Sequence, residues 1–250
     1  METVITVAEP TVRDNSPTYS SDDYLTWFCD FLTNDSGNSN LEGGTFLGTD
    51  VYYRIYNKDS DLISQRDSIN SVNTSSNGNS AATRMVESYK YKPLGLGIKN
   101  SIGEYVKYDN GGYVFVPSSS SNRKIRFRPK TYKGSEDVSE ENVDLYTMRA
   151  CVGVGNEYKK TGNAYVIPIR SNGKTFDFFD DDDDDDDETD RFDIEPVSGD
   201  EDFECNSTIT AENTYYVQFF AVGVAWSDST CTSIFSLVLD LGSIPIKKGN

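Results

Sequence analysis

The chain has 250 residues, a formal net charge of −18 and a mean hydropathy of −0.56. This length suits one elaborated domain or two small ones. The acidic balance argues against nucleic acid as a partner, because the summed field of the protein would repel phosphates. Only 36% of the residues are hydrophobic, but 16 Tyr and 13 Phe offset this, since aromatic side chains bury a large area and favour strands. The composition is typical of a mostly-β secreted domain.

The first part of the chain predicts strands followed by helices. Three stretches are rich in β-branched and aromatic residues, and we expect strands at residues 4–12, 24–32 and 49–56. The apolar spacing then changes to that of helices over residues 60–91. Ser60 and Ser80 are suitable N-cap residues, and Pro93 closes the segment. We expect these helices to pack on an edge of the β-structure.

The middle of the chain predicts further strands separated by polar turns. Gly111–Gly112 separates two short β-prone runs, which indicates a hairpin. We expect these strands at residues 104–108, 113–116, 123–128, 145–154 and 163–170, and residues 175–179 then lead into the acidic run.

The longest β-prone apolar run lies at residues 209–225. One set of alternating positions holds Tyr215, Val217, Phe219 and Ala221, and the other holds Tyr216, Gln218, Phe220, Val222 and Val224. A strand covered on both faces has this pattern, whereas a strand with one wet face alternates apolar and polar residues. Gly223 and the aromatic bias argue against a buried helix. We therefore predict a central strand here and a closing strand at 233–241.

Four of these segments resemble, in order, strands of the fibronectin type III family. That family's sixth strand follows a Leu-x-Pro-Gly-Thr-x-Tyr-x-Val-x-Val-x-Ala pattern, and the corresponding positions here are Ile209, Asn213, Tyr215, Val217, Phe219 and Ala221. Leu25-Thr26-Trp27 resembles the second strand with its core tryptophan, Tyr53-Arg54-Ile55-Tyr56 the third, and Glu9-Pro10 the entry of the first. Ala211 and Glu212 depart from the pattern, because they replace its Pro-Gly. The resemblance implies that the Tyr215 hydroxyl hydrogen-bonds to upstream backbone.

The resemblance implies an immunoglobulin-like β-sandwich formed by residues 1–57 and 206–250. An insertion at residues 58–205 would interrupt it. We expect the insertion to hold a helical segment at 60–91, extra strands at 104–179 and a disordered acidic loop at 180–202. The chain is also similar in style to bacterial cell-envelope lipoproteins with such interrupted sandwiches.

The start of the chain lacks the basic and apolar regions of a secretory leader. No apolar run approaches the roughly 18–20 residues that span a bilayer. Together with the composition, this favours a cell-envelope or extracellular protein whose signal or lipoprotein leader is not in this chain. Membrane contact would then occur only through a removed N-terminal lipid anchor.

The acidic run Asp180–Asp187 is the most conspicuous candidate site. Adjacent carboxylates repel one another within the roughly 8 Å Debye length and cannot be buried unpaired, so one interpretation is a solvated, disordered loop. A second is a weak calcium site, since hard cations take several carboxylate oxygens. Its ligands would be Asp180, Asp181, Asp182 and Asp183. A third is contact with a basic partner.

A cationic stripe is the second candidate. Lys124, Arg126 and Arg128 alternate with apolar residues, which predicts a strand with one charged face. Such a face is often only solvated. The alternative is a ridge that binds an anionic ligand, such as an acidic glycan or the aspartate run itself.

The four cysteines permit two disulfides in an oxidising compartment. They are Cys29, Cys151, Cys205 and Cys231. Because Cys205 and Cys231 flank the predicted central strand and its turn, we expect this pair to be bonded. Cys29 is equally consistent with a small core residue.

Several enzyme classes are excluded by composition. The chain has no histidine, which removes Ser–His and Cys–His pairs and His-bound zinc sites. No nucleotide-binding loop and no G-x-S-x-G elbow is present. We therefore predict no catalytic residues and a non-catalytic binding or adhesion module for an unknown protein or glycan. The alternatives are a calcium- or glycan-dependent carbohydrate-binding domain and a glycosidase-like enzyme with a carboxylate pair. Calcium is the one cofactor that the sequence suggests.

Overall fold

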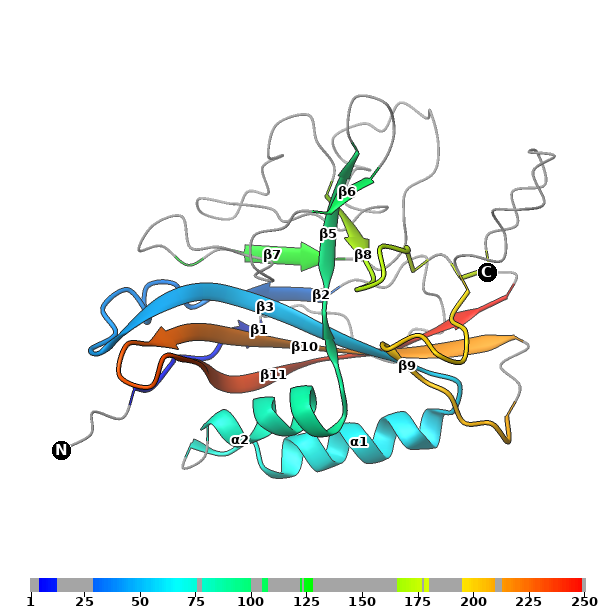
Figure 1. The fold of residues 1–250 in the computed structure, drawn as a ribbon, viewed down its shortest axis with the longest axis horizontal. Helices are drawn as coiled ribbons and strands as arrows, with labels where there is room; N and C mark the ends of the chain where they lie inside the picture. The colour runs from blue at the N-terminus through cyan, green and yellow to red at the C-terminus, as the bar shows by residue number, and fades with distance from the viewer. Residues whose placement is uncertain are drawn as a thin grey trace.

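The computed structural model describes residues 5–12, 29–75, 78–99, 105–107, 122, 124–127, 166–176, 178–179, 195–209 and 213–248. This part of the chain is mostly strand, with a large antiparallel sheet and two short α-helices (Figure 1). The predicted mostly-β class is therefore confirmed. The predicted strands at 113–116 and 145–154, and Trp27, lie outside the described residues.

The main sheet is built on three long strands. They are β3 (Gly44–Tyr56), β10 (Thr214–Ser227) and β11 (Thr232–Lys247), and two short strands, β4 (Lys92–Pro93) and β9 (Phe203–Glu204), join them. The order is β11-β10-β3-β4, and β9 pairs in parallel with β3. Because β10 pairs with β11 on one side and with β3 on the other, the stretch predicted as central has this position.

The two faces of β10 contribute to two separate hydrophobic clusters. The first contains Tyr215, Val217, Phe219 and Ala221 with Val51, Tyr53 and Ile55 of β3. The second contains Phe220, Val222 and Val224 with Tyr52 and Tyr56 of β3. This division follows the alternation of the sequence, so the prediction of a strand covered on both faces is confirmed.

Helices cover one face of the main sheet. They are α1 (Asp59–Ser71), α2 (Gly78–Thr83) and a short π-helix, η2 (Arg84–Ser88), and Figure 1 shows α1 and α2 together on one side of the sheet. The prediction of helices in this region is confirmed, but their expected place on an edge is wrong. Leu62, Ile69 and Met85 instead pack into the cluster of Phe220, because an apolar helix face buries more surface against a sheet face than along its rim. The N-cap of α1 is Lys58, not Ser60, and makes no side-chain cap hydrogen bond.

The opposite face of the main sheet is covered by other strands and by loops. A small sheet of β1 (Thr11–Val12), β2 (Cys29–Leu32) and β7 (Lys124–Phe127) lies on this side, away from the helices (Figure 1). Phe31 of β2 joins the cluster of Tyr53, as do Phe176, Phe178 and Phe203. Both clusters thus combine residues from either side of the predicted boundaries at 57/58 and 205/206.

A third sheet contains β5 (Gly95–Lys99), β6 (Tyr105–Lys107) and β8 (Val166–Ile169) in the order β6-β5-β8. The strands expected at 104–108 and 163–170 are present in shorter form. Residue 176 forms a bend and residues 178–179 a turn, so the extra strands expected within 104–179 do not extend to this segment. Phe176 and Phe178 are nevertheless buried, because they fill the core from a loop.

Asparagine side chains replace strand pairing at two places. Asn73 donates to the Val238 carbonyl at 2.7 Å and accepts from its amide at 2.9 Å, and Asn79 accepts from the Phe235 amide at 3.0 Å. These bonds occupy the outer edge of β11, which would otherwise offer free backbone groups to another chain. Asn38 bonds the Ala8 amide and carbonyl in the same way, at 2.7 and 2.9 Å. Within residues 4–12, the described strand is therefore limited to Thr11–Val12.

None of the helices in the described ranges has both the length and the apolar content needed to cross a bilayer.

Candidate functional site

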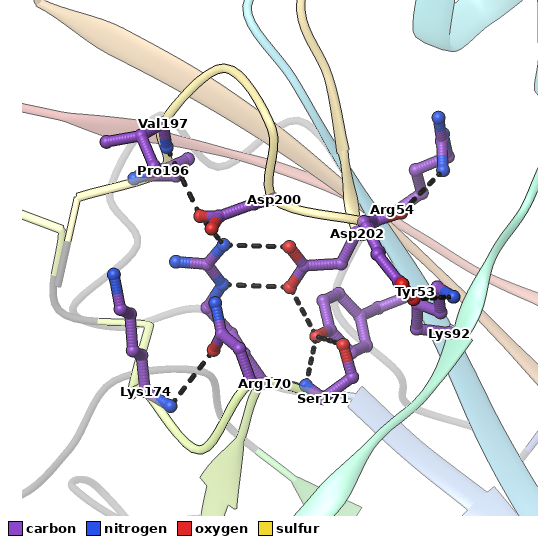
Figure 2. Close-up of polar contacts among 12 residues, drawn as sticks. Tyr53, Arg54, Lys92, Arg170, Ser171, Lys174, Pro196, Val197, Asp200 and Asp202 are labelled. Carbon is purple, nitrogen blue, oxygen red and sulfur yellow. Dashed lines mark hydrogen bonds and ion pairs between the residues drawn. The ribbon is translucent and has the colours of Figure 1, made fainter. Parts of the chain in front are cut away.

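The guanidinium of Arg170 lies at the centre of a buried polar cluster (Figure 2). Arg170 has no exposed surface, and Tyr53 and Asp202 are 0% and 1% exposed. Arg170 follows β8, Tyr53 belongs to β3, and Asp202 precedes β9, so three segments meet here. We call Arg170, Asp200, Asp202 and Tyr53 the arginine cluster.

The carboxylates of Asp200 and Asp202 accept hydrogen bonds from the Arg170 guanidinium. Arg170 Nε donates to Asp202 Oδ2 at 2.9 Å, and Nη2 donates to Asp202 Oδ1 at 2.8 Å and to Asp200 Oδ2 at 2.6 Å. Tyr53 Oη donates to Asp202 Oδ2 at 2.5 Å and accepts from the Ser171 amide at 2.6 Å. A bidentate arginine–carboxylate pair of this kind fixes both position and orientation.

Two tight turns bring these side chains together. The Arg170 amide donates to the Lys174 carbonyl at 2.7 Å, and Gly173 takes the positive φ of 88° that this turn needs. In the second turn the Asp200 amide donates to the Val197 carbonyl at 2.9 Å, and the Val197 amide donates to Asp200 Oδ2 at 3.2 Å. The Asp202 carbonyl accepts from Ile55 of β3, which attaches the turn to the main sheet.

The electrostatics of the cluster follow from burial and pairing. Burial disfavours the Arg170 cation, but the hydrogen bonds and charge of Asp202 outweigh it, so its pKa is raised. Burial likewise opposes ionisation of Asp200, yet the hydrogen bond from Arg170 lowers its pKa overall. Burial and the charge of Asp202 raise the pKa of Tyr53 well above its usual range. All three groups therefore keep their usual protonation states at neutral pH.

The arrangement can hold chain segments together, but the buried guanidinium cannot reach an external ligand. Phe178 lies 5.8 Å from the guanidinium carbon and helps to enclose it. The arginine cluster also corrects one expectation, because residues 195–202 were predicted to belong to a disordered acidic loop. They are ordered, since Asp202 is buried against a cation instead of solvated. Asp180 and residues 181–194 lie outside the described residues.

Tyr215 forms a second contact to the same turn. Its hydroxyl donates to Glu195 Oε1 at 2.7 Å and lies 3.4 Å from the Pro196 carbonyl oxygen. The Phe179 ring stacks on Tyr215 with 5.6 Å between centroids. The hydroxyl thus binds Glu195 and Pro196, 20 and 19 positions upstream, and its shorter bond is to a carboxylate.

The sequence did not single out the arginine cluster as a site. The available signal was the placement of Arg170 directly after the apolar run Val166–Ile169 and before a Ser-Asn-Gly turn. An arginine at the end of a buried strand needs an acidic partner, because an unpaired buried charge is costly. The partner itself gave no local signal, since Asp202 lies among other acidic residues.

The candidate sites that the sequence did single out fall largely outside the described side chains. The expected strand around Lys124 and Arg126 is present as β7, where Leu32 pairs with Lys124 and Asp30 with Arg126 in register. Arg128 lies outside the described residues, as do Asp180, Asp181, Asp182 and Asp183. No group of three or more potential ligand side chains that could hold a metal occurs in the ranges that the structure covers.

The predicted Cys205–Cys231 disulfide is wrong, because both thiols are free and exposed. Cys205 follows β9, which lies beside the end of β3 that pairs with Tyr216 of β10. Cys231 lies in the turn beyond Ser227, at the other end of β10. At about 3.3 Å per residue, the strand between these points spans roughly 35 Å, far more than the roughly 7 Å that a disulfide bridges.

We expect both thiols to react in the native protein. Alkylation without reductant, followed by peptide mass spectrometry, should label Cys205 and Cys231 to completion, because both are exposed. The C205S/C231S variant should keep the wild-type melting temperature. A disulfide-linked peptide containing both residues would contradict the structure.

Four buried tyrosines predict loss of the fold at high pH. They are Tyr53, Tyr56, Tyr91 and Tyr215, and burial is the main cause that raises each pKa. A raised folded-state pKa stabilises the fold fully below the unfolded value of about 10, and this stabilisation is lost as the pH rises through the folded values. In an alkaline titration followed by phenolate absorbance, these four should titrate late and together with unfolding. Titration of all 16 tyrosines in one step near pH 10, with the fold intact, would contradict this.

Comparisons of the chain with protein-family models, with curated proteins and with solved structures found no match.

Proposed function

We propose that this chain is a non-catalytic binding or adhesion module of a cell-envelope or secreted protein, with a protein or a glycan as its partner. The supporting observation is how the buried charges are used. Arg170 binds Asp200 and Asp202, and Arg54 binds Glu204, so these charges hold the fold together instead of converging on a substrate. The chain also lacks histidine, the side chain best suited to proton transfer near neutral pH.

We propose a fibronectin-III-like sandwich, formed by residues 1–57 and 206–250, as the scaffold of this module. In immunoglobulin-like sandwiches the third, sixth and seventh strands share one sheet, and the first, second and fifth share the other. The order β11-β10-β3 and the pairing of β1 with β2 support this assignment, with β3 as third strand and β10 as sixth. The helices and loops of the insertion then add layers to a binding scaffold.

The cationic stripe supplies the test of this function. If Lys124, Arg126 and Arg128 form a ridge for an anionic ligand, the wild-type protein should bind a heparin column at low salt. Their replacement with Ser should abolish retention, because binding of a polyanion depends on the number of cationic contacts.

A matched variant controls for net charge in the heparin experiment. Replacement of Lys58, Lys174 and Lys248 with Ser removes the same charge from other places, and these side chains are half-buried or exposed. This variant should keep most of the retention. Equal retention of the wild type and the Lys124, Arg126 and Arg128 variant would contradict an anion-binding ridge there.

A calcium-dependent carbohydrate-binding domain is the second candidate, and the run Asp180–Asp187 favours it. A ligand that binds only the folded state raises the melting temperature. If Asp180, Asp181, Asp182 and Asp183 bind calcium in the folded state, millimolar Ca²⁺ should raise it, and their replacement with Asn should remove the effect. No shift with Ca²⁺ relative to Mg²⁺ would favour the first proposal.

A further inference from the structure

A strip of polar side chains crosses the helix-covered face of the main sheet. Arg54 of β3 and Gln218 of β10 pair in register, and Gln218 Nε2 donates to Asp240 Oδ1 of β11 at 2.7 Å. Asn70 of α1 donates to Asp240 Oδ2 at 2.9 Å. These side chains share the face of Phe220, so polar groups pass through an otherwise apolar interface between helix and sheet.

Two atoms of this strip are buried and lack a hydrogen-bond partner among the residues that the structure describes. They are Arg54 Nε and Gln218 Oε1. Gln218 is 0% and Arg54 6% exposed, so bulk water does not satisfy either atom. The other nitrogens of Arg54 are used, since Nη1 donates to the Lys90 carbonyl at 3.0 Å and Nη2 to Glu204.

The orientation of the Gln218 amide is fixed by its other contacts. Its Nε2 donates to Asp240 Oδ1 and, at 3.0 Å, to the Phe219 carbonyl. A flipped amide would place its oxygen against two acceptors, which is unfavourable. The atom left without a partner is therefore the acceptor Oε1.

The two atoms are complementary to one small ligand. Arg54 Nε–H can only donate, and Gln218 Oε1 can only accept. Directly paired positions of neighbouring strands place their Cβ atoms about 4.5–5.5 Å apart, so the two side chains leave the sheet side by side on its helix-covered face. Buried polar groups in folded proteins are nearly always satisfied, by protein or by ordered water.

We propose that one ordered water molecule binds between Arg54 and Gln218, accepting from Nε–H and donating to Oε1. This hydrated site joins β3 to β10 beneath the helical layer. Tyr91, which is 1% exposed and packs on Phe220 with 5.5 Å between ring centroids, encloses the interface. The inference is independent of the proposed function, because it concerns how the helical layer is attached.

Two measurements on the wild-type protein test the proposal. A high-resolution crystal structure should show a water within hydrogen-bond distance of both atoms. In solution, the Arg54 Nε–H proton should exchange slowly and give a direct magnetisation-transfer peak to a long-lived water in a nitrogen-edited experiment. A direct bond between Arg54 Nε and Gln218 Oε1, or an Arg54 side chain turned to solvent, would overturn it.

Paired variants separate the water from the general state of the fold. Gln218→Met removes the acceptor with little change in volume and should abolish the water peak of Arg54. Gln65→Met removes an acceptor of Tyr56 on the same side of the sheet and should leave the peak unchanged. Persistence of the peak in folded Gln218→Met would contradict a water held by Oε1.

Discussion

The Arg170→Met variant should lose about 3–5 kcal/mol of unfolding free energy, which is the cost of removing one partner from a buried ion pair. The substitution leaves the Asp202 carboxylate 1% exposed without its cation, and Asp200 loses its bond at 2.6 Å. Native domains have only about 5–15 kcal/mol of stability, so the loss is a large fraction of the total. Urea unfolding followed by circular dichroism measures it.

Two further variants separate the buried charge from lost packing. The double variant R170M/D202L removes both charges and should recover part of the loss, since no uncompensated Asp202 remains. Lys92→Met breaks the exposed pair with Glu201, at 2.5 Å, and should leave stability close to that of the wild type. Near-wild-type stability of Arg170→Met would contradict a structural role for the arginine cluster.

Phe219→Ala and Phe220→Ala should each lose about 3–5 kcal/mol, the usual cost of truncating a buried phenylalanine. The two residues are neighbours on β10 but belong to opposite clusters, and both are 0% exposed. Phe219 lies 5.8 Å from Phe176 and 6.5 Å from Tyr53 between ring centroids, whereas Phe220 contacts Tyr91. A large loss of unfolding free energy in both variants would show that each face of β10 is covered.

Trp226→Ala on the same strand is the matched control for this pair. Trp226 is 39% exposed, so its truncation should cost less than that of either phenylalanine. Thermal unfolding gives the ranking, since about 1 kcal/mol shifts the melting temperature of a chain this long by about 2–4 °C. A small loss from only one of the two phenylalanines would show that its face is wet.

The long strands could be predicted because their signal is local. From Tyr215 to Val222 of β10 and from Val51 to Tyr56 of β3, most residues are apolar or aromatic, and successive ones alternate between the cluster of Phe219 and the cluster of Phe220. Such a pattern depends only on the two-residue period of a strand. The sequence therefore predicts which residues share a face of a strand, without predicting which elements cover that face.

The partners of those faces could not be predicted in the same way. Whether α1 packs on an edge or on a face depends on which strands neighbour β10, and pairing over long separations leaves no local pattern. The link from Arg170 to Asp202 likewise crosses 32 positions of the chain. The predicted Cys205–Cys231 disulfide failed for another reason. The two residues are close in the sequence, but the extended strand β10 lies between them and keeps them apart in space.

The fold depends most on β10 as a fully paired strand between β3 and β11. Native-state amide hydrogen exchange tests this directly, because backbone amides of a strand point alternately to its two neighbours. We expect slow exchange at consecutive amides from Tyr216 to Val222, near the rate set by global unfolding. Slow exchange at only every second amide would place β10 on an edge, and fast exchange throughout would contradict the fold.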